Sequence, residues 1–189
     1  MPYAEQLHRN EWVVAPVPTF AEARSFIEQW HYARGTSNTA TERHGLYHVE
    51  DNRLMGVALW MPPTRRAAES ICSDWQSVLS LSRLAIHPDA PRNSASFLLG
   101  KSMKLLSPRW KMLLTYADTH QGHTGGIYLA TNWTRVGYVP AGDTWVDDDG
   151  RQWGRKRGGR TLRVAEMREL GLRRVPHAPK IKFTYNRGK

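Results

Sequence analysis

A short apolar strand that runs directly into a glycine-broken, polar loop is the feature that most constrains this chain. We expect residues 111–117 to form a buried strand and residues 125–133 a short helix that carries Tyr128 and Asn132. The loop between them holds Asp118, Thr119, His120, Gln121 and His123. Open α/β sheets bind ligands in the crevice beyond the carboxyl ends of their strands. The stretch 111–138 therefore predicts a sheet with a ligand site at this strand end.

The charge of the chain is strongly basic, because 27 lysines and arginines outnumber 17 aspartates and glutamates. A net charge of +10 favours a polyanionic partner, and nucleic acid is the leading choice. The alternative is a basic surface that only keeps the protein in solution.

A length of 189 residues with 40% hydrophobic side chains suits a single domain, 1–189, with a tail or an insertion. The lone cysteine, Cys72, excludes an intramolecular disulfide and a cysteine-based zinc site, and it fits a reducing cytoplasm. The N-terminus has no secretory pattern, and no apolar run is long enough to span a bilayer. We expect a soluble, cytoplasmic protein with no membrane partner; the sequence does not predict its oligomeric state.

The rest of the chain alternates between strand and helix signals. Thr19 and Glu22 form a capping box, so a helix begins at Phe20. Asp51 and Asn52 tolerate the left-handed geometry of a tight turn, so the strands beside them form a hairpin. In chain order we expect a strand at 12–17, a helix at 20–30, a hairpin of 45–50 and 54–61, a central strand at 76–86, a helix from Asn93 or Ser94 to Leu106, the strand and helix described above, and a final strand.

Arg83 lies within the most apolar of these strands. A guanidinium is almost never buried without a partner, so an anion should meet it, and Asp118 on the neighbouring strand is the obvious candidate. The alternative is an arginine whose stem packs in the sheet while its head reaches the edge, or an ion pair that is only structural.

Residues 91–96 open the helix that follows this strand, so free backbone amides and the helix dipole point beyond the sheet. A phosphate or an acyl oxyanion would be stabilised there. Ser94 and Ser96 could donate hydrogen bonds to it, although serine at a helix start is more often a cap. The residues of this candidate cofactor site are Arg92, Asn93, Ser94 and Ala95.

His120, His123 and Asp118 could present nitrogen and oxygen ligands to a metal, but histidines free on the surface of a glycine-rich loop are more common. Tyr128 can return from the following helix to the same crevice, or it can pack in the core beside Trp133.

His31 and Tyr32 follow the first helix and precede a flexible loop, from which they could fold over the open end of the sheet. His31 could act there as a general base near neutral pH. Alternatively it is a C-cap that interacts with the helix dipole.

The segment 151–189 is rich in cations and includes a helical pattern over 161–170. Its phosphate contacts would be independent of sequence and sensitive to salt. The alternative is a solvated helix face, because Glu166 and Glu169 alternate with the arginines. The candidate DNA-binding residues are Arg155, Lys156, Arg157, Arg160 and Arg163, and the aromatic residues that could stack on bases are Trp145, Trp153 and Tyr185.

Three motifs together resemble one family. They are SLSRLAIHPDAPRNSASFLLGK, LLTYADTHQGHTGGIYLATNWTRVGY and the His-Tyr pair after the first helix. With them the chain resembles, over about residues 31–185, the Mom family of phage DNA modification proteins, an offshoot of the GNAT fold. The resemblance implies an α/β fold with a mixed, mostly antiparallel central sheet flanked by helices. It also implies a transferase that converts the N6 amino group of adenine in double-stranded DNA to a carbamoylmethylated form, which protects phage DNA from restriction in the cytoplasm of the bacterial host.

The positions that match family residues associated with activity are Arg83, Ser96, Asp118, Tyr128 and His31. A bound iron is implied by the resemblance, with His31, Asp118 and Tyr128 as its ligands. One departure concerns the donor, because the chain has no glycine where GNAT enzymes admit the CoA pyrophosphate. The donor is expected to be acetyl-CoA or another acyl or aminoacyl carrier.

In this interpretation adenine is extruded into the crevice, since N6 chemistry needs the base outside the stack. Asp118 or His31 manages protons, Arg83 orients Asp118 or the donor, and Ser96 with the helix start holds the donor. Two rival functions remain. One is a GNAT-type N-acetyltransferase acting on a small amine or a protein, and the other is a non-catalytic nucleic-acid-binding protein on a GNAT scaffold.

Overall fold

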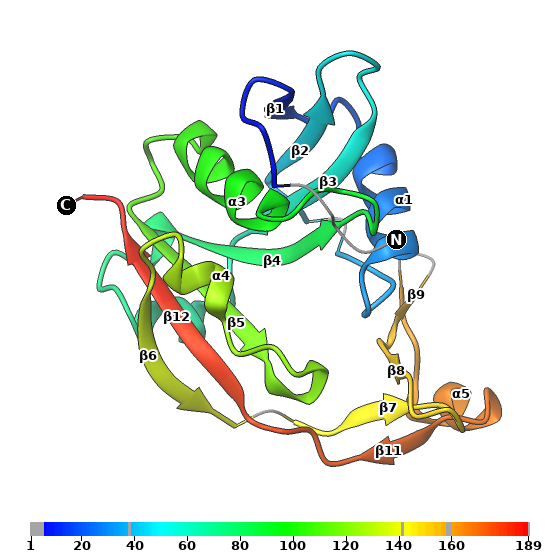
Figure 1. Cartoon of the computed structure of the whole chain (residues 1–189). Helices are drawn as coiled ribbons and strands as arrows, with labels where there is room; N and C mark the ends of the chain where they lie inside the picture. Colours follow the sequence, from blue (N-terminus) through cyan, green and yellow to red (C-terminus); the bar gives the residue numbers. More distant parts are fainter. Residues whose placement is uncertain (1–5, 38, 141, 158–159, 189) are drawn as a thin grey trace.

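A seven-stranded sheet forms the body of the protein in the computed structural model, which describes residues 6–37, 39–140, 142–157 and 160–188 (Figure 1). Its strands, in spatial order, are β1 (Trp12–Pro16), β2 (Glu42–His48), β3 (Leu54–Met61), β4 (Val78–Ile86), β5 (Met112–Asp118), β12 (Lys180–Asn186) and β6 (Thr134–Val139). Among these strands only β4 and β5 pair in parallel. The expected mixed, mostly antiparallel sheet is confirmed.

Two long helices cover opposite faces of this sheet. Successive side chains of a strand point to opposite faces, and β3 shows this directly. Ala58 and Trp60 belong to the same core cluster as helix α3 (Ser94–Leu105), whereas Val57 and Leu59 belong to the cluster of helix α1 (Phe20–Trp30). Because both faces are covered, the central strands read as continuous apolar runs.

Local capping and turn signals set the boundaries of the N-terminal half. The Thr19 hydroxyl accepts a hydrogen bond from the Glu22 amide at 3.2 Å, and α1 begins at Phe20 as predicted. The β2–β3 hairpin turns through Asn52 at a φ of 53°, the left-handed geometry expected for that residue. The polar segment after the hairpin contains a short helix that the sequence did not indicate, α2 (Arg65–Glu69), and a 3₁₀ turn, η1 (Trp75–Ser77), so β4 starts two residues later than expected.

The helix expected at 125–133 is one turn long, α4 (Gly126–Leu129), and is preceded by the 3₁₀ turn η2 (Thr119–Gln121). Tyr128 and Trp133 nonetheless join the main core, where their ring centroids lie 5.7 Å apart. Short as it is, α4 fixes Tyr128 above the strands.

The basic C-terminal segment divides into two parts. Residues 144–175 form what we call the small lobe, which comprises β7 (Thr144–Val146), β8 (Gln152–Trp153), β9 (Lys156–Arg157), β10 (Arg160–Thr161), α5 (Val164–Glu169) and β11 (Arg173–Val175). The lobe has its own core of Trp145, Leu162, Met167 and Leu172. The chain then returns as β12, which enters the main sheet between β5 and β6 (Figure 1). No described helix is long and apolar enough to cross a membrane.

Candidate active site

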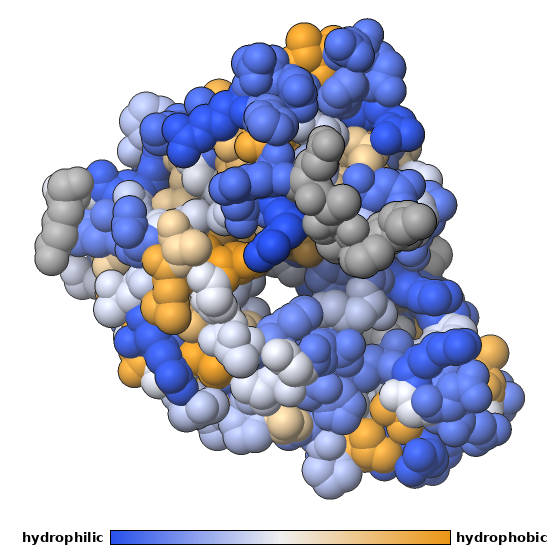
Figure 2. All heavy atoms as spheres, in the orientation of Figure 1, coloured by the Kyte–Doolittle hydropathy of each residue, from blue (hydrophilic) through white to orange (hydrophobic). Residues whose placement is uncertain are grey.

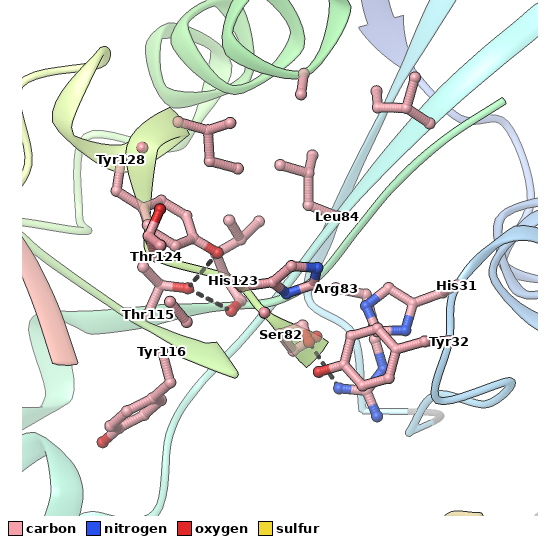
Figure 3. Close-up of a pocket in the computed structure, with 18 residues that line it drawn as sticks. His31, Tyr32, Ser82, Arg83, Leu84, Thr115, Tyr116, His123, Thr124 and Tyr128 are labelled. Atoms are coloured by element: carbon pink, nitrogen blue, oxygen red, sulfur yellow. Dashed lines mark hydrogen bonds between the residues drawn. The ribbon is translucent and has the colours of Figure 1, made fainter. Parts of the chain in front are cut away.

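The strands β4 and β5 separate soon after they pair, and this separation creates a cavity. Their parallel register covers only Val78–Ser80 against Met112–Leu114. Beyond it the strands form opposite walls of a space of about 490 Å³, which we call cavity A. Its polar walls are formed by His31, Tyr32, Ser82, Arg83, Thr115, Tyr116, His123, Thr124 and Tyr128 (Figure 3). The strand end singled out in the sequence therefore borders a cavity.

Asp118, at the end of β5, is the most contacted polar group of this region. Its carboxylate is buried, with 3% of the residue exposed. Oδ2 accepts a hydrogen bond from the Tyr32 hydroxyl at 3.1 Å and lies 3.3 Å from His177 Nε2 and 3.7 Å from Lys180 Nζ. Oδ1 accepts from the His120 amide at 3.1 Å. This carboxylate is held in place by four groups from three separate parts of the chain.

Arg83 has no carboxylate partner among the described residues, so the expected ion pair with Asp118 is wrong. Its guanidinium donates to the Gly35 carbonyl at 2.8 Å and to the Ser82 carbonyl at 2.6 Å. Two neutral carbonyls leave the cation uncompensated, and burial lowers the pKa of Arg83. The remaining N–H donors of Arg83 therefore stand beside cavity A as a site for an anion or a polarised carbonyl.

His31 is neutral in the folded protein. Burial, the Arg83 cation and His123 together lower the pKa of His31 from 6.5 to about 3. Its Nδ1 accepts a hydrogen bond from the Ala33 amide at 3.1 Å, so the ring proton resides on Nε2. The expectation of a general base near neutral pH is therefore wrong at this position. A neutral imidazole whose free lone pair is already bonded can serve only as a donor.

Tyr128 combines a core position with a hydroxyl that lines cavity A. The Thr115 hydroxyl lies 3.4 Å from the Tyr128 oxygen and 3.3 Å from the Leu81 carbonyl, and its one proton can be donated to only one of them (Figure 3). Burial raises the pKa of Tyr128, so the phenol stays protonated at neutral pH. Packing and chemistry were alternatives for this residue in the sequence, but the ring packs against Phe183 while its hydroxyl lines cavity A. It can act as a proton donor there.

The start of α3 lies between cavity A and a second hollow. Asn93 adopts a φ of 71° without a side-chain cap, which leaves the amides of Ala95 and Ser96 without a described partner. Ser94 is buried and its hydroxyl donates to the Pro91 carbonyl, so it does not act as an N-cap, whose side chain accepts from a backbone amide. Ala95 lines cavity A, whereas Ser96 lines a groove of about 750 Å³ between α3 and residues 130–132, which directly follow α4; we call it the α3–α4 groove. Ser96 is thus not brought together with Asp118 and Tyr128, and Arg92 is exposed beside Gln6.

A third hollow lies between the main sheet and the small lobe. This space of about 590 Å³, cavity B, is walled by Asp118 and Lys180 on one side and by Gln152 and Trp153 on the other. Figure 2 shows the molecule hollowed between its body and the lobe. Tyr116 borders both cavities, and the Tyr32–Asp118 hydrogen bond connects them.

The residues expected to bind iron do not form a ligand set. Asp118 is already bonded to Tyr32 and paired with His177 and Lys180, the free lone pair of His31 is bonded to Ala33, and Tyr128 holds its proton. Among the described residues no three His, Cys, Asp or Glu side chains converge with metal-ligand spacing. His120 and His123 do not converge on a common site either, because His120 packs on His177 and His123 packs on Tyr32. This arrangement of side chains does not support a bound iron.

The basic run is partly occupied by internal bonds. Arg160 is paired with Glu166 at 2.6 Å, Arg155 donates twice to the Leu162 carbonyl, and Arg157 stacks on Trp153 at 3.7 Å. The side chain of Lys156 lies outside the described residues. Arg163 is exposed, with no carboxylate within ion-pair distance in the described part of the chain, although its charge helps to lower the pKa of Glu166. Trp145 is buried in the core of the lobe, so a base cannot stack on it, and the Tyr185 ring packs against Trp133.

The family model of the Mom proteins matches residues 11–167, which is most of the chain. The chain belongs to the Mom protein family. It is 30% identical over 121 residues to a methylcarbamoylase from Escherichia phage Mu; the alignment covers 61% of this chain and about half, 49%, of that relative. His177 and Lys180, which contact Asp118, lie beyond the range that the family model matches.

Solved structures place this Mom-family chain on the GNAT fold. The ribosomal-protein-S18-alanine N-acetyltransferase of Escherichia coli superposes with a TM-score of 0.55 at 12% identity, covering 93% of each chain. The ribosomal-protein-S5-alanine acetyltransferase of Vibrio fischeri gives 0.56 at 6% identity, covering 96% of each. A Salmonella typhimurium structure with its cofactor acetyl-CoA gives 0.55 at 8% identity, covering 93% of each. At these identities the likeness establishes the fold alone.

Proposed function

We propose that this protein is a phage DNA modification enzyme that transfers a carbamoylmethyl-type group to the N6 amino group of adenine, and so protects the DNA from restriction. The observation that carries the proposal is the position of Asp118, a buried carboxylate at the junction of two cavities. Membership of the Mom family and the methylcarbamoylase relative of phage Mu support the same activity. The net charge of +10 suits a DNA substrate.

Cavity A suits the donor end of the reaction. Tyr128 presents a phenol proton, Arg83 presents unused cationic N–H donors, and His31 presents Nε2–H. All three are hydrogen-bond donors. Together they would polarise a carbonyl of the molecule that supplies the transferred group and stabilise negative charge as it develops there. Donors fixed by the surrounding structure do this without reorganising during the reaction.

The α3–α4 groove suits the carrier of the transferred group. Its walls include Arg9, Lys101 and Lys104, none of which has an acidic partner among the described residues. Ser96, whose amide has no described partner, also lines this groove at the start of α3, and helix starts favour anions. These groups fit the pyrophosphate of an acyl-CoA, and another anionic acyl or aminoacyl carrier would meet the same donors.

Asp118 would receive the proton of the amine. In the transfer of a carbamoylmethyl group, a bond forms between the amine nitrogen and the methylene carbon of that group, while the bond from the methylene carbon to the leaving atom of its carrier breaks. The departing carrier atom takes a proton from Tyr128, and the amine gives one to Asp118. General acid and base groups of this kind contribute roughly 10²–10⁴-fold to a rate.

Mass spectrometry of nucleosides tests the proposal. DNA from cells that express the wild type should contain a deoxyadenosine carrying the added carbamoylmethyl mass. Asp118→Asn and Tyr128→Phe should fold normally and lower that signal by about 100-fold or more. Asp89→Asn, which changes a carboxylate that is 70% exposed, should leave it unchanged. Unmodified DNA from wild-type cells, or full modification by both site variants, would overturn the proposal.

Acetylation of a small amine or a protein is the second candidate function, because the superposed structures are acetyltransferases. The two functions differ in the product, which is an acetylated amine in one case and an altered deoxyadenosine in the other. Incubation with acetyl-CoA and a panel of amines, with release of free thiol as the readout, would support acetylation.

A further inference from the structure

Cavity B contains an unmatched hydrogen-bond donor. Gln152, on β8, lines the cavity, and its Nε2 is buried without a hydrogen-bond partner in the described part of the chain. A buried donor without a partner is costly, and native proteins rarely keep one without a reason. The opposite wall carries Asp118, an acceptor. Gln152 and Asp118 thus place one unpartnered donor and one acceptor within the walls of the cavity.

Two arginines, Arg34 and Arg157, lie near each other next to residues that line cavity B. The loop after α1 and the start of the small lobe come together here, since a Cβ on Gly154 would lie 3.7 Å from the Ala33 carbonyl. Arg34 follows Ala33, and it lies close enough to Arg157 to help lower the pKa of Arg157, after the larger effect of burial. Neither guanidinium has a carboxylate within ion-pair distance among the described residues.

Two features define the positions of these arginines. Arg34 adopts a φ of 42°, which is uncommon for a residue other than glycine. Arg157 is held over the Trp153 ring at 3.7 Å, and Trp153 is fixed in turn by a hydrogen bond of 2.8 Å from Nε1 to Asp147. Two arginines placed near one another with no counter-ion form a natural receptor for a phosphate, which accepts several charge-assisted hydrogen bonds.

We propose that cavity B and the two arginines beside it bind one nucleotide of the acceptor strand, with the base between Asp118 and Gln152 and its phosphate between Arg34 and Arg157. The proposal rests on the DNA-modifying function given above and assigns the acceptor to cavity B, leaving cavity A to the donor. Residues 144–175, the small lobe, then serve as the outer wall that captures an extruded base.

The two polar groups define which bases fit. Asp118 accepts from an exocyclic amine, and Gln152 donates to a neighbouring ring nitrogen. On the Watson–Crick edge, adenine and cytosine present an amine beside an acceptor ring nitrogen, whereas guanine and thymine present a protonated ring nitrogen that would face the donor of Gln152. The site therefore selects a base whose amine can be modified.

Binding of short single-stranded oligonucleotides tests this assignment. Each carries one base, A, C, G or T, between abasic positions, and affinity is measured by fluorescence anisotropy. The wild type should prefer A and C over G and T by about tenfold. Gln152→Leu should retain overall affinity but lose the preference, and Gln152→Glu, which keeps the size and polarity, should lose it as well. An unchanged preference in both variants would overturn the base assignment.

The phosphate contact is tested with a matched pair of stacked arginines. Arg34→Ala and Arg157→Ala should each weaken binding several-fold and reduce the slope of log affinity against log salt by about 1. Arg109, which lies over Trp110 at 3.9 Å before the start of β5, is the control, and Arg109→Ala should bind like the wild type. Equal effects of Arg157→Ala and Arg109→Ala would overturn the phosphate assignment.

The same proteins separate this inference from the proposed function. If the wild type modifies DNA and the Arg34, Arg157 and Gln152 variants modify it equally well, the nucleotide site is wrong while the function stands. If the wild type yields no altered nucleoside but the oligonucleotides bind with the predicted dependence, the function is wrong while the site stands.

Discussion

The Tyr32 hydroxyl donates a hydrogen bond of 3.1 Å to Asp118, a residue 86 positions further along the chain. The bond joins the loop after α1 to the end of β5, and it passes between cavity A, which Tyr32 lines, and cavity B, which Asp118 lines. Burial and the carboxylate together raise the pKa of Tyr32, so its proton stays on the phenol. The two halves of the candidate site are therefore oriented by one contact.

Loss of this hydroxyl should affect activity more than folding. In Tyr32→Phe the carboxylate keeps His177, Lys180 and the His120 amide, and a hydrogen bond to a charged group is worth about 1.5–3 kcal/mol. We expect a loss of roughly tenfold to 100-fold in the modification rate. Tyr47→Phe is the control, because the Tyr47 hydroxyl is buried without a described partner. Equal rates for the two variants, measured beside their denaturant midpoints, would contradict this role.

Much of the fold follows from local signals in the sequence. The bounds of α1 follow from Thr19 and the helical pattern, and the β2–β3 hairpin follows from Asp51 and Asn52. Asp118, at the strand end, was predicted to carry the chemistry, and the cavities meet beside it. These features are encoded within a few residues, so a sequence pattern can reveal them.

The contacts of Asp118 could not be predicted from local sequence patterns. His177 lies in an irregular segment, and Lys180 reaches Asp118 only because β12 enters the sheet beside β5 in a register that aligns these two residues. No local pattern encodes which strand inserts where. Strands of two or three residues, such as β8 in the small lobe, are also too short to show a period.

The position of Tyr128 depends on Gly125. Gly125 has a φ of 84°, and a Cβ there would overlap the ring of Phe183. Gly125→Ala should therefore destabilise the fold by about 2–4 kcal/mol, from overpacking and left-handed strain together. Gly126→Ala, where a Cβ would meet nothing within 4 Å, should change stability by less than about 1 kcal/mol. Chemical denaturation compares the two, and similar losses from both glycines would contradict the packing argument.

The buried His31 should make stability depend on pH. Its pKa is about 3 when folded, against 6.5 for the ordinary side chain, so below pH 6.5 the unfolded chain binds a proton that the folded protein does not. Stability due to His31 is complete above pH 6.5 and is lost as the pH falls towards 3, by up to about 1.4 kcal/mol per pH unit. His31→Asn can keep the Ala33 hydrogen bond but does not titrate.

Denaturation at pH 7 and pH 5 isolates this effect. The stability advantage of the wild type over His31→Asn should shrink by about 2 kcal/mol between the two values. Burial also lowers the pKa of His44, but that residue is present in both proteins and cancels in the comparison. Parallel stability curves for the two proteins would show that His31 is not neutral when folded.

Two changes in the small lobe should move the salt dependence of duplex binding in opposite directions. Arg163 is exposed with no carboxylate within ion-pair distance among the described residues, so Arg163→Ala should reduce the slope of log affinity against log salt by about 1. Arg160 is held by Glu166 through two hydrogen bonds of 3.1 and 2.6 Å, which lower the pKa of Glu166 to about 2. Glu166→Gln should release that arginine for a phosphate and raise the slope by about 1, while still accepting from the Arg163 amide. Titrations of one duplex over a series of KCl concentrations measure both slopes, and identical slopes would place the DNA on another face of the protein.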